Sequence, residues 1–263
     1  MLGMIERHEH SHILHRLGFD TMTDTAGHDW ITFHRLRFPE PVSALKRTFP
    51  PVAGTDCWLF GPHYDVGPDG MLTGVSDTWG GVGIWHSRDA AEAMVAAPGD
   101  HMPWLGETVA AWHCLSVPVS HRGAVNWRGY LQNGDAVRAT PVDPGGPLIV
   151  LTSAGFVSRD AATLPRIKRF VAGVVEVLDT FGAQPSNLRR AAFRGSFEGR
   201  DGFTLSLWHS DEGMLQAAYH SGTHRTQINE DKAGLLSDRT SFTRLRVIRS
   251  WGDWEGEVAW THP

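Results

Sequence analysis

An internal repeat constrains the fold of this 263-residue chain more than any other feature of its sequence. The segment GIWHSRDAAEAMVAAPGDH (83–101) aligns without a gap with SLWHSDEGMLQAAYHSGTH (206–224), at an offset of 123 residues. A Trp-His-Ser triplet coincides near the start of both segments, and His101 aligns with His224 at their end. A repeat of this kind indicates one structural unit that occurs twice in the chain.

Hydrophobic periodicity predicts a similar order of elements around each copy. In the first half the pattern predicts strands over 30–38, 57–60, 78–85 and 108–119, and helical segments over 42–48 and 88–97. In the second half it predicts strands over 147–156, 188–197, 202–208 and 242–248, and helices over 160–181, 210–219 and 224–235. We expect Pro39 and Pro41 to end the first strand, and Trp251 and Trp254 to pack in the core or as a lid.

The order strand–helix–strand–strand–helix–strand is that of a ferredoxin-like unit. We therefore predict an α+β fold in which two tandem ferredoxin-like units form a dimeric α+β barrel within one chain. The predicted parts are a polar, His-rich N-terminal segment (1–28), a first unit (29–130), a linker (131–146) and a second unit (147–263). A cofactor-sized apolar pocket between the two packed sheets is the expected place for function.

Composition argues against several classes of function. The net charge of −5 disfavours nucleic acid or an anionic membrane surface as the main partner. No apolar run approaches the roughly 18–20 residues of a transmembrane helix, and the N-terminus lacks a signal-peptide pattern. Cys57 and Cys114 are expected to be buried thiols, and no dinucleotide-binding, P-loop, nucleophile-elbow or HExxH motif occurs. We expect a cytoplasmic protein that acts on a small molecule.

Fifteen histidines supply candidate ligands. His224 follows a glycine at a predicted helix start, where its ring can project between sheet and helix as an axial ligand of haem iron; the alternative is a solvent-facing histidine near a helix cap. His101 occupies the equivalent position of the first copy and is the candidate distal or substrate-side catalytic group, or else a surface residue. His86 and His209, which follow the repeated tryptophans, are expected to be structural.

Two further groups of side chains could bind a ligand. His8, His12 and His15 would share one helix face in a divalent-metal site, unless they belong to a polar tail. Arg190 and Arg246 lie on predicted strands and are the candidate partners of haem propionates, because the planar guanidinium pairs with a carboxylate. Alternatively, these arginines form the solvated face of a sheet.

The second half also carries a family pattern. The segment GPLIVLTSAGF is followed by a long helix that ends before NLRRAAF, and then by FTLSLWHSDEGMLQAAYHSGTHRTQI and FTRLRVIRSWGDWEG. Over residues 147–256 this pattern resembles the spheroidene monooxygenase family of carotenoid ketolases. The Gly-x-His element of that family falls on His224. Residues 30–130 match only in outline, through SDTWGGVGIWHSRDAAEAM and the strand after it.

The resemblance implies a haem-containing oxygenase on a duplicated dimeric α+β barrel, an architecture that haem aldoxime dehydratases share. It implies haem b as cofactor, with His224 as the iron ligand, and a monooxygenase of secondary metabolism that oxidises a small or lipophilic substrate with O2. Electrons would come from an external donor such as a ferredoxin, because the chain has no flavin or iron–sulfur motif, and the chain could act as a homodimer. Two alternatives stay open: a haem-dependent dehydratase or N–O/N–N-directed enzyme with His101 as distal acid, and a cofactor-free barrel that binds an apolar ligand.

Overall fold

The computed structural model describes residues 27–123, 137–195, 201–220, 222–232, 234–256 and 260–261. The first half contains β1 (Trp30–Ser43), β2 (Cys57–Pro62), β3 (Val75–Trp85), α2 (Arg88–Ala96), α3 (Pro98–His101), the 3-10 helix η2 (Pro103–Glu107) and β4 (Ala110–Gly123). The second half contains β5 (Leu148–Gly155), α4 (Leu164–Gly182), β6 (Asn187–Arg194), β7 (Asp201–Trp208), α5 (Asp211–His220), α6 (Gly222–Lys232), β8 (Arg239–Gly252) and β9 (Trp260–Thr261). The candidate metal-binding histidines of the N-terminal segment lie outside the described residues.

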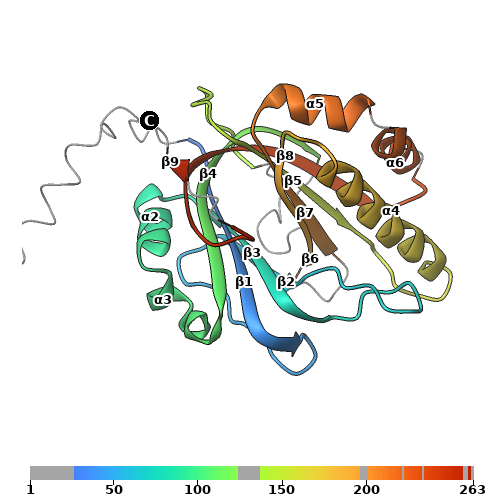
Figure 1. Ribbon diagram of the computed structural model, residues 1–263, viewed down its shortest axis with the longest axis horizontal. Helices are drawn as coiled ribbons and strands as arrows, with labels where there is room; N and C mark the ends of the chain where they lie inside the picture. The colour runs from blue at the N-terminus through green and yellow to red at the C-terminus, as the bar shows by residue number, and fades with distance from the viewer. Residues whose placement is uncertain are drawn as a thin grey trace, which may run out of the picture.

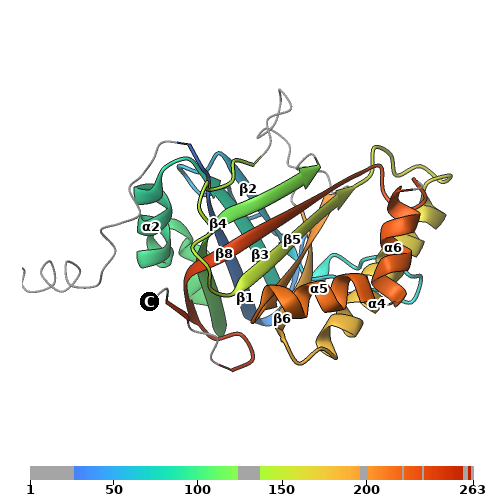
Figure 2. The same cartoon turned by 90° about the horizontal axis from the view of Figure 1, so that it is seen from above.

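The architecture is α+β, with one nine-stranded antiparallel sheet and helices on its outer side (Figure 1). The strand order is β2-β3-β1-β4-β8-β5-β7-β6, with β9 beside β8. Each half therefore places its strands in the order second, third, first, fourth, and the two fourth strands, β4 and β8, pair with each other at the centre. Helices α2 and α3 lie against the first half, and α4, α5 and α6 lie against the second (Figures 1 and 2).

The two ends of the sheet, β2 and β6, approach each other. An isolated antiparallel bridge joins His63 to Phe193, and the Tyr64 amide donates a hydrogen bond to the Ala192 carbonyl at 2.9 Å. The approach is close enough that a Cβ atom at Gly61 would lie 1.8 Å from the carbonyl oxygen of Arg194. The sheet therefore curls until its ends touch, and the contact requires a residue without a side chain in β2.

The inner face of the curled sheet is packed with apolar side chains from both halves. Phe33 is the centre of this core, with its ring 5.9–6.0 Å from the rings of Trp112, Phe193 and Trp254. Cys57 and Cys114 are buried in the same core, as predicted, and burial raises the pKa of both thiols. The space inside the curled sheet, where the sequence predicts a cofactor pocket, is thus filled by the main hydrophobic core. The cavity described below lies instead on the outer face of the sheet, under the helices.

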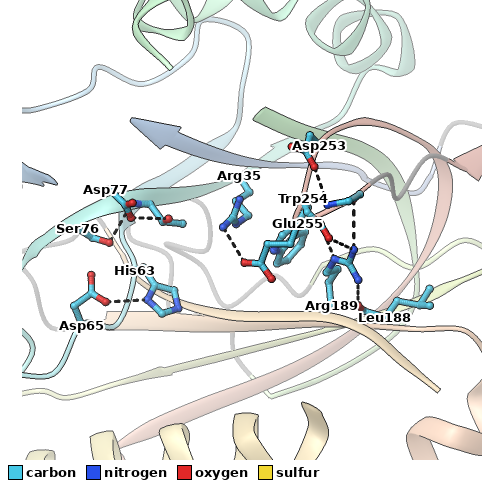
Figure 3. Close-up of polar contacts among 12 residues, drawn as sticks. Arg35, His63, Asp65, Ser76, Asp77, Leu188, Arg189, Asp253, Trp254 and Glu255 are labelled. Atoms are coloured by element: carbon cyan, nitrogen blue, oxygen red, sulfur yellow. Dashed lines mark hydrogen bonds and ion pairs between the residues drawn. The ribbon is translucent and has the colours of Figure 1, made fainter. Parts of the chain in front are cut away.

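The segment after β8 closes one end of this core (Figure 3). Trp254 is 1% exposed and packs inside, which confirms its expected role. Arg189 donates hydrogen bonds to the carbonyls of Trp254 and Glu255 at 2.6 and 2.8 Å. On the other side of the segment, Arg35 donates to the Glu255 carboxylate at 3.4 Å and lies over the Trp254 ring. Two arginines thus hold the closing segment, Arg189 by its backbone and Arg35 by the Glu255 carboxylate.

Most predicted elements are present, with one clear error. The predicted helix over 42–48 does not form, because β1 continues past Pro39 and Pro41 to Ser43 and a turn follows. The pairing register of β1 with β3 shifts between Arg37 and Val42, so the prolines sit where the ladder is interrupted and their missing N–H groups cost nothing. Ser87 caps α2, since its hydroxyl accepts a hydrogen bond from the Ala90 amide at 3.3 Å.

Among the described residues, no helix combines the length and the apolar character that crossing a membrane requires.

The contact between the sheet ends makes a testable prediction. Gly61→Ala should destabilise the protein by about 1–3 kcal/mol or more, because the new methyl group must push β2 away from the backbone of β6. Gly99→Ala is the matched control, since nothing lies within 4 Å of a Cβ atom there. Thermal unfolding of the two variants measures the effect. Equal melting temperatures would show that the sheet ends are not in contact.

Candidate cofactor site

A cavity lies between the outer face of the second half of the sheet and the three helices α4, α5 and α6. Figure 2 shows these helices beside the second half of the sheet. Its empty volume is about 940 Å³, part of which is open to solvent. The space that a water-sized sphere can enter is about 130 Å³, which is smaller than the roughly 300–1,000 Å³ usual for small-molecule and cofactor sites. The lining is largely apolar, with valine, leucine and phenylalanine side chains of α4 opposite small side chains of β5 and β7.

Small side chains on the sheet explain why the cavity lies in the second half. A row across β6, β7, β5 and β8 consists of Ala192, Thr204, Thr152 and Phe242. The row at the same place in the first half consists of Phe60, Gly81, His34 and His113. At two of these four positions, Phe60 and His34 stand where the second half has the smaller Ala192 and Thr152. At the other two, Gly81 and His113 stand where it has the larger Thr204 and Phe242.

The next row shows the same contrast. Trp79 precedes Trp85 by six residues in β3, and Gly202 precedes Trp208 by six residues in β7. Trp79 belongs to an aromatic cluster that fills the outer face of the first half, whereas Gly202 lines the cavity. Phe49, from the loop where the second half has α4, packs on both Phe60 and Trp79. Aromatic side chains therefore occupy in one half the space that is hollow in the other.

Helix α4 forms the long wall of the cavity. The residues that it contributes recur with helical spacing and are Phe170, Gly173, Val174, Val177, Leu178 and Phe181. From Phe170 to Phe181 the wall is roughly 16 Å long, at 1.5 Å of rise per residue. Gly173 leaves room for the Gln227 amide of α6, which would lie 2.5 Å from a Cβ atom at that position. Of the apolar residues that recur along this helix, Ile167 and Val171 are buried and Val174 and Leu178 line the cavity, whereas Leu164 and Val175 are exposed.

His224 lies in the first turn of α6 and lines the cavity near Phe181, at a ring distance of 5.2 Å. Its Nδ1 lies 2.8 Å from the carbonyl oxygen of Ala218, so the proton on Nδ1 is donated to that carbonyl. Among the described residues, Nε2 has no hydrogen-bond partner. Burial lowers the pKa of His224, and the Ala218 carbonyl opposes this shift in part. The imidazole is therefore neutral near pH 7, with a fixed tautomer and a lone pair on Nε2, which is the form that binds a metal.

The cavity face of α6 continues from His224 through Gln227, Ile228 and Asp231. Asp231 accepts hydrogen bonds from the hydroxyls of Ser237 and Thr240 at 2.7 and 2.9 Å. Since Thr240 belongs to β8, this contact fixes the C-terminal turn of α6 to the sheet. Sequence reasoning missed Gln227 and Asp231, although they follow His224 at helical spacings of three and seven residues.

Of the four predicted site residues, His224 is the one that lines the cavity. Arg246 instead donates hydrogen bonds to Asp143 and Asp211, and the bond to Asp143 raises the pKa of its guanidinium. Arg190 is exposed on β6, with its guanidinium against Gly182 at the end of α4. His101 ends the short helix α3 of the first half. The structure does not bring these three side chains to His224.

Of the other two repeated histidines, His86 has polar contacts of a structural kind. His86 lies with its Nδ1 2.9 Å from the buried carboxylate of Asp29 and its Nε2 3.3 Å from that of Asp56. Arg138 pairs with the same Asp29 carboxylate at 2.7 Å. His209 is exposed. In the part of the chain that is described, no three His, Cys, Asp or Glu side chains gather as a metal-binding group. A haem iron, however, needs only one ligand from the protein.

A second pair of histidines is buried in the aromatic cluster of the first half. His34 and His113 face each other on β1 and β4, with 2.8 Å between their Nδ1 atoms. Trp58 packs on His34, and Trp251 packs on His113. Burial holds the pKa of His34 well below its usual range, with His113 adding to the shift, and burial lowers the pKa of His113 to about 4. Both imidazole rings are therefore uncharged near pH 7, and they pack within the aromatic cluster as uncharged side chains.

This pair predicts how stability depends on pH. Unfolded histidines titrate near 6.5, and His113 in the folded protein titrates near 4. As the pH falls the unfolded chain takes up protons first, so stability is fully present above about pH 6.5 and declines toward about pH 4. We expect the free energy of unfolding, measured by urea denaturation, to fall by up to about 1.4 kcal/mol per pH unit for each histidine in this window.

The double variant His34→Gln, His113→Gln is the control for this experiment, because it removes both titrating groups. Its free energy of unfolding should depend less steeply on pH between 6.5 and 4 than that of the original protein. The same slope in both proteins would show that the pair is not buried in its neutral form.

Comparisons with known proteins give a fold but no family. No family model matches the chain, and no curated protein matches it significantly. An aldoxime dehydratase structure matches 86% of this chain and 83% of its own, at 12% identity and a TM-score of 0.53. An aldoxime dehydratase in complex with butyraldoxime matches 86% and 81%, at 11% identity and a TM-score of 0.54. At these identities the matches show the fold alone.

A smaller match is a cofactor-independent oxygenase from Streptomyces nogalater. It covers 43% of this chain and 98% of its own, at 10% identity and a TM-score of 0.31. A score this low carries no argument about the site.

Proposed function

We propose that the protein is a haem-dependent monooxygenase that holds haem b in the cavity of the second half, with Nε2 of His224 as the iron ligand. The observation that carries this proposal is the state of His224. Its Nδ1–H is donated to the Ala218 carbonyl, its ring lines an apolar cavity, and burial keeps it neutral. A metal-bound histidine usually has its second nitrogen fixed in this way by a carbonyl or carboxylate.

What supports haem in this cavity is the chemistry of its lining, which is largely apolar. The described lining residues include no lysine or arginine that could pair with a propionate. A Cβ atom at Gly173 or at Gly202 would collide with a neighbouring side chain. These two glycines therefore allow neighbouring side chains to pack directly against the backbone of α4 and β7 in the walls of the cavity. Arg190, Arg246 and His101 are outside this proposal, because the structure places them away from the cavity.

In this proposal the cofactor and the protein have separate roles. Haem, when bound, supplies the activation of O2, and reducing equivalents come from an external donor such as a ferredoxin. The chain's own residues bind and orient: the Ala218 carbonyl fixes the tautomer of His224, and the apolar side chains of α4 exclude water. The Phe181 ring contacts both the Trp208 ring and the His224 ring, and it thereby helps to fix the position of the imidazole. The substrate class, a small or lipophilic molecule, and a cytoplasmic setting follow from the family resemblance and are part of the proposal.

We also infer that the two halves arose as tandem ferredoxin-like units that form a dimeric α+β barrel within one chain. Three observations support this. Both halves have the same strand order, and the 123-residue offset brings Trp85 and Trp208 to the same place in each sheet, opposite Trp30 and Leu148 respectively. The sheet ends meet at the bridge between His63 and Phe193.

Absorption spectroscopy tests the iron ligand. Full-length protein purified with hemin should show a Soret band, and His224→Ala should remove or strongly shift it, with hemin binding weakened by more than about tenfold. His209→Ala, which alters an exposed histidine, is the control and should keep the original spectrum. An unchanged band in His224→Ala contradicts the assignment. Colourless protein that takes up no hemin would instead favour the cofactor-free binding barrel.

A haem-dependent dehydratase is the second candidate, favoured by the fold match to the butyraldoxime complex. Such an enzyme removes water from an aldoxime to give a nitrile, without O2 and without net oxidation. It needs a proton donor beside the substrate, and the candidate for that role, His101, lies in the first half. The hydroxyls that line the cavity on β5 and β7, including those of Thr152 and Ser206, are the alternative donors.

Anaerobic turnover separates the two candidates. Hemin-loaded protein reduced with dithionite under nitrogen should leave butyraldoxime unchanged if the protein is a monooxygenase. Butyronitrile, measured by gas chromatography above the level formed with free hemin, would contradict the monooxygenase proposal and support the dehydratase.

A further inference from the structure

The guanidinium of Arg35 is buried at one end of the core without the hydrogen-bond partners that such a group needs. Arg35 lies on the inner face of β1, two residues after Phe33, and its side chain is 8% exposed. A guanidinium has several N–H donors, and here they have one acceptor among the described residues, a Glu255 carboxylate oxygen at 3.4 Å. Charge-assisted hydrogen bonds of this kind are usually about 2.7–2.9 Å long, so this contact is weak.

A second buried arginine shows how a fully paired guanidinium is held in this protein. The Arg246 side chain is 9% exposed, so it is nearly as buried as that of Arg35. It donates two hydrogen bonds to the Asp143 carboxylate, at 2.8 and 2.9 Å, and others to the Asp211 carboxylate and the Gly146 carbonyl. Arg35 is equally buried and has no such set of close acceptors among the described residues. Because a buried charge without partners is unfavourable, its donors are suited to an anion from outside the protein.

The other charged groups around Arg35 do not supply the missing partners. Asp77 accepts a hydrogen bond from the Thr78 hydroxyl at 2.9 Å, and Asp253 accepts one from the Gly256 amide at 2.9 Å. Both carboxylates act on the guanidinium electrostatically, from beyond the distance of an ion pair. Arg37, two residues further along β1, is exposed and adds a second positive charge on the same face of the strand.

Glu255 is held by its backbone, so its carboxylate can leave Arg35 while the closing segment stays in place. Arg189 donates hydrogen bonds to the carbonyls of Trp254 and Glu255, whereas the Glu255 side chain is turned toward Arg35 and is 71% exposed (Figure 3). Among the described residues, Glu255 is the one non-glycine residue with a positive φ, 52°. Residues in this unfavourable conformation are concentrated at ligand sites. The Glu255 carboxylate thus marks a position beside Arg35 that the carboxylate of a ligand can take.

We propose that Arg35 anchors a binding site for a small organic monocarboxylate, which pairs with the guanidinium in place of Glu255. The planar fork of a guanidinium matches the two oxygens of a carboxylate. A single negative charge suits this position, because Asp77 and Asp253 would repel a dianion such as phosphate more strongly. The site lies on the inner side of the sheet, at the end of the core that Trp254 closes. It is therefore separate from the cavity under the helices, goes beyond the proposed function and does not require haem.

Benzoate and its neutral analogue benzamide test the site, since the two molecules have nearly the same shape and differ in charge. Isothermal titration calorimetry with the full chain as purified, at constant ionic strength, gives both affinities. Benzoate should bind at least about tenfold more tightly than benzamide, the effect of a charge-assisted hydrogen bond. Glu255→Gln removes the internal competitor and should tighten benzoate binding about twofold to fivefold, the effect of one exposed ion pair. Glu92→Gln, which removes the same charge from an ion pair of α2, is the matched control and should leave the affinity unchanged.

Arg35→Met tests the anchor itself. It should weaken benzoate binding by more than about tenfold, to the level of benzamide, without lowering the melting temperature, because it removes a poorly paired buried charge. If this variant does not fold, the comparison of Glu255→Gln with the original protein decides alone. Benzoate binding that survives in Arg35→Met, equal affinities for the two probes, or no tightening in Glu255→Gln would overturn the inference. All of these measurements are made without hemin, so the haem proposal is decided separately by the Soret band.

Discussion

The pairing of β4 with β8 is the interaction on which the rest of the structure depends. These are the last strands of the two halves, and they pair antiparallel from Trp112 opposite Gly252 to Gly123 opposite Ser241. The pairing makes one sheet of two, so that the inner faces of both halves meet in a common core. The helices are left to the outer faces. Any site between helix and sheet must therefore lie outside the core, one in each half at most.

The two outer faces have diverged in a way that strand register makes explicit. In the first half, Trp79, His34 and Phe60 fill the outer face, and Phe49 packs into it from the loop that replaces a helix. In the second half the same rows contain glycine, threonine and alanine under a helix of 19 residues. Packing density decides the outcome, since a cavity survives only where neighbouring side chains cannot collapse into it. The first half stabilises the molecule and contributes one side chain, that of Tyr64, to the described lining, and the second half contains the cavity.

Local sequence signals predicted much of this structure correctly. The cap at Ser87 and the helix over Leu164–Gly182 depend on residues within one or two turns of each other, and both are present. The strand predicted over 30–38 is present too, but all of its residues except Arg37 are buried, whereas an alternating sequence is typical of a strand with one exposed face. The helix expected over 42–48 failed because pairing with β3 extends β1 past two prolines. Arg246 does not reach the cavity, because its guanidinium donates hydrogen bonds to Asp143 and Asp211. These two residues lie 103 and 35 residues away in the sequence. Both errors come from partners that are distant in the sequence.

The sequence by itself determined a similar order of strands in both halves and a helix start close to His224. Repeats and helix caps depend on residues that are close together in the sequence, and so they can be recognised without coordinates. Only the tertiary structure decided that the core fills the space between the sheets, that the cavity lies on one outer face, and that Tyr64 crosses from the other half to reach it. These features arise where strands from both halves come into register, and the size of each side chain matters only against its neighbours across the sheet. Gly61 and Gly202 show this directly, because the reason for each glycine is an atom more than 100 residues away along the chain.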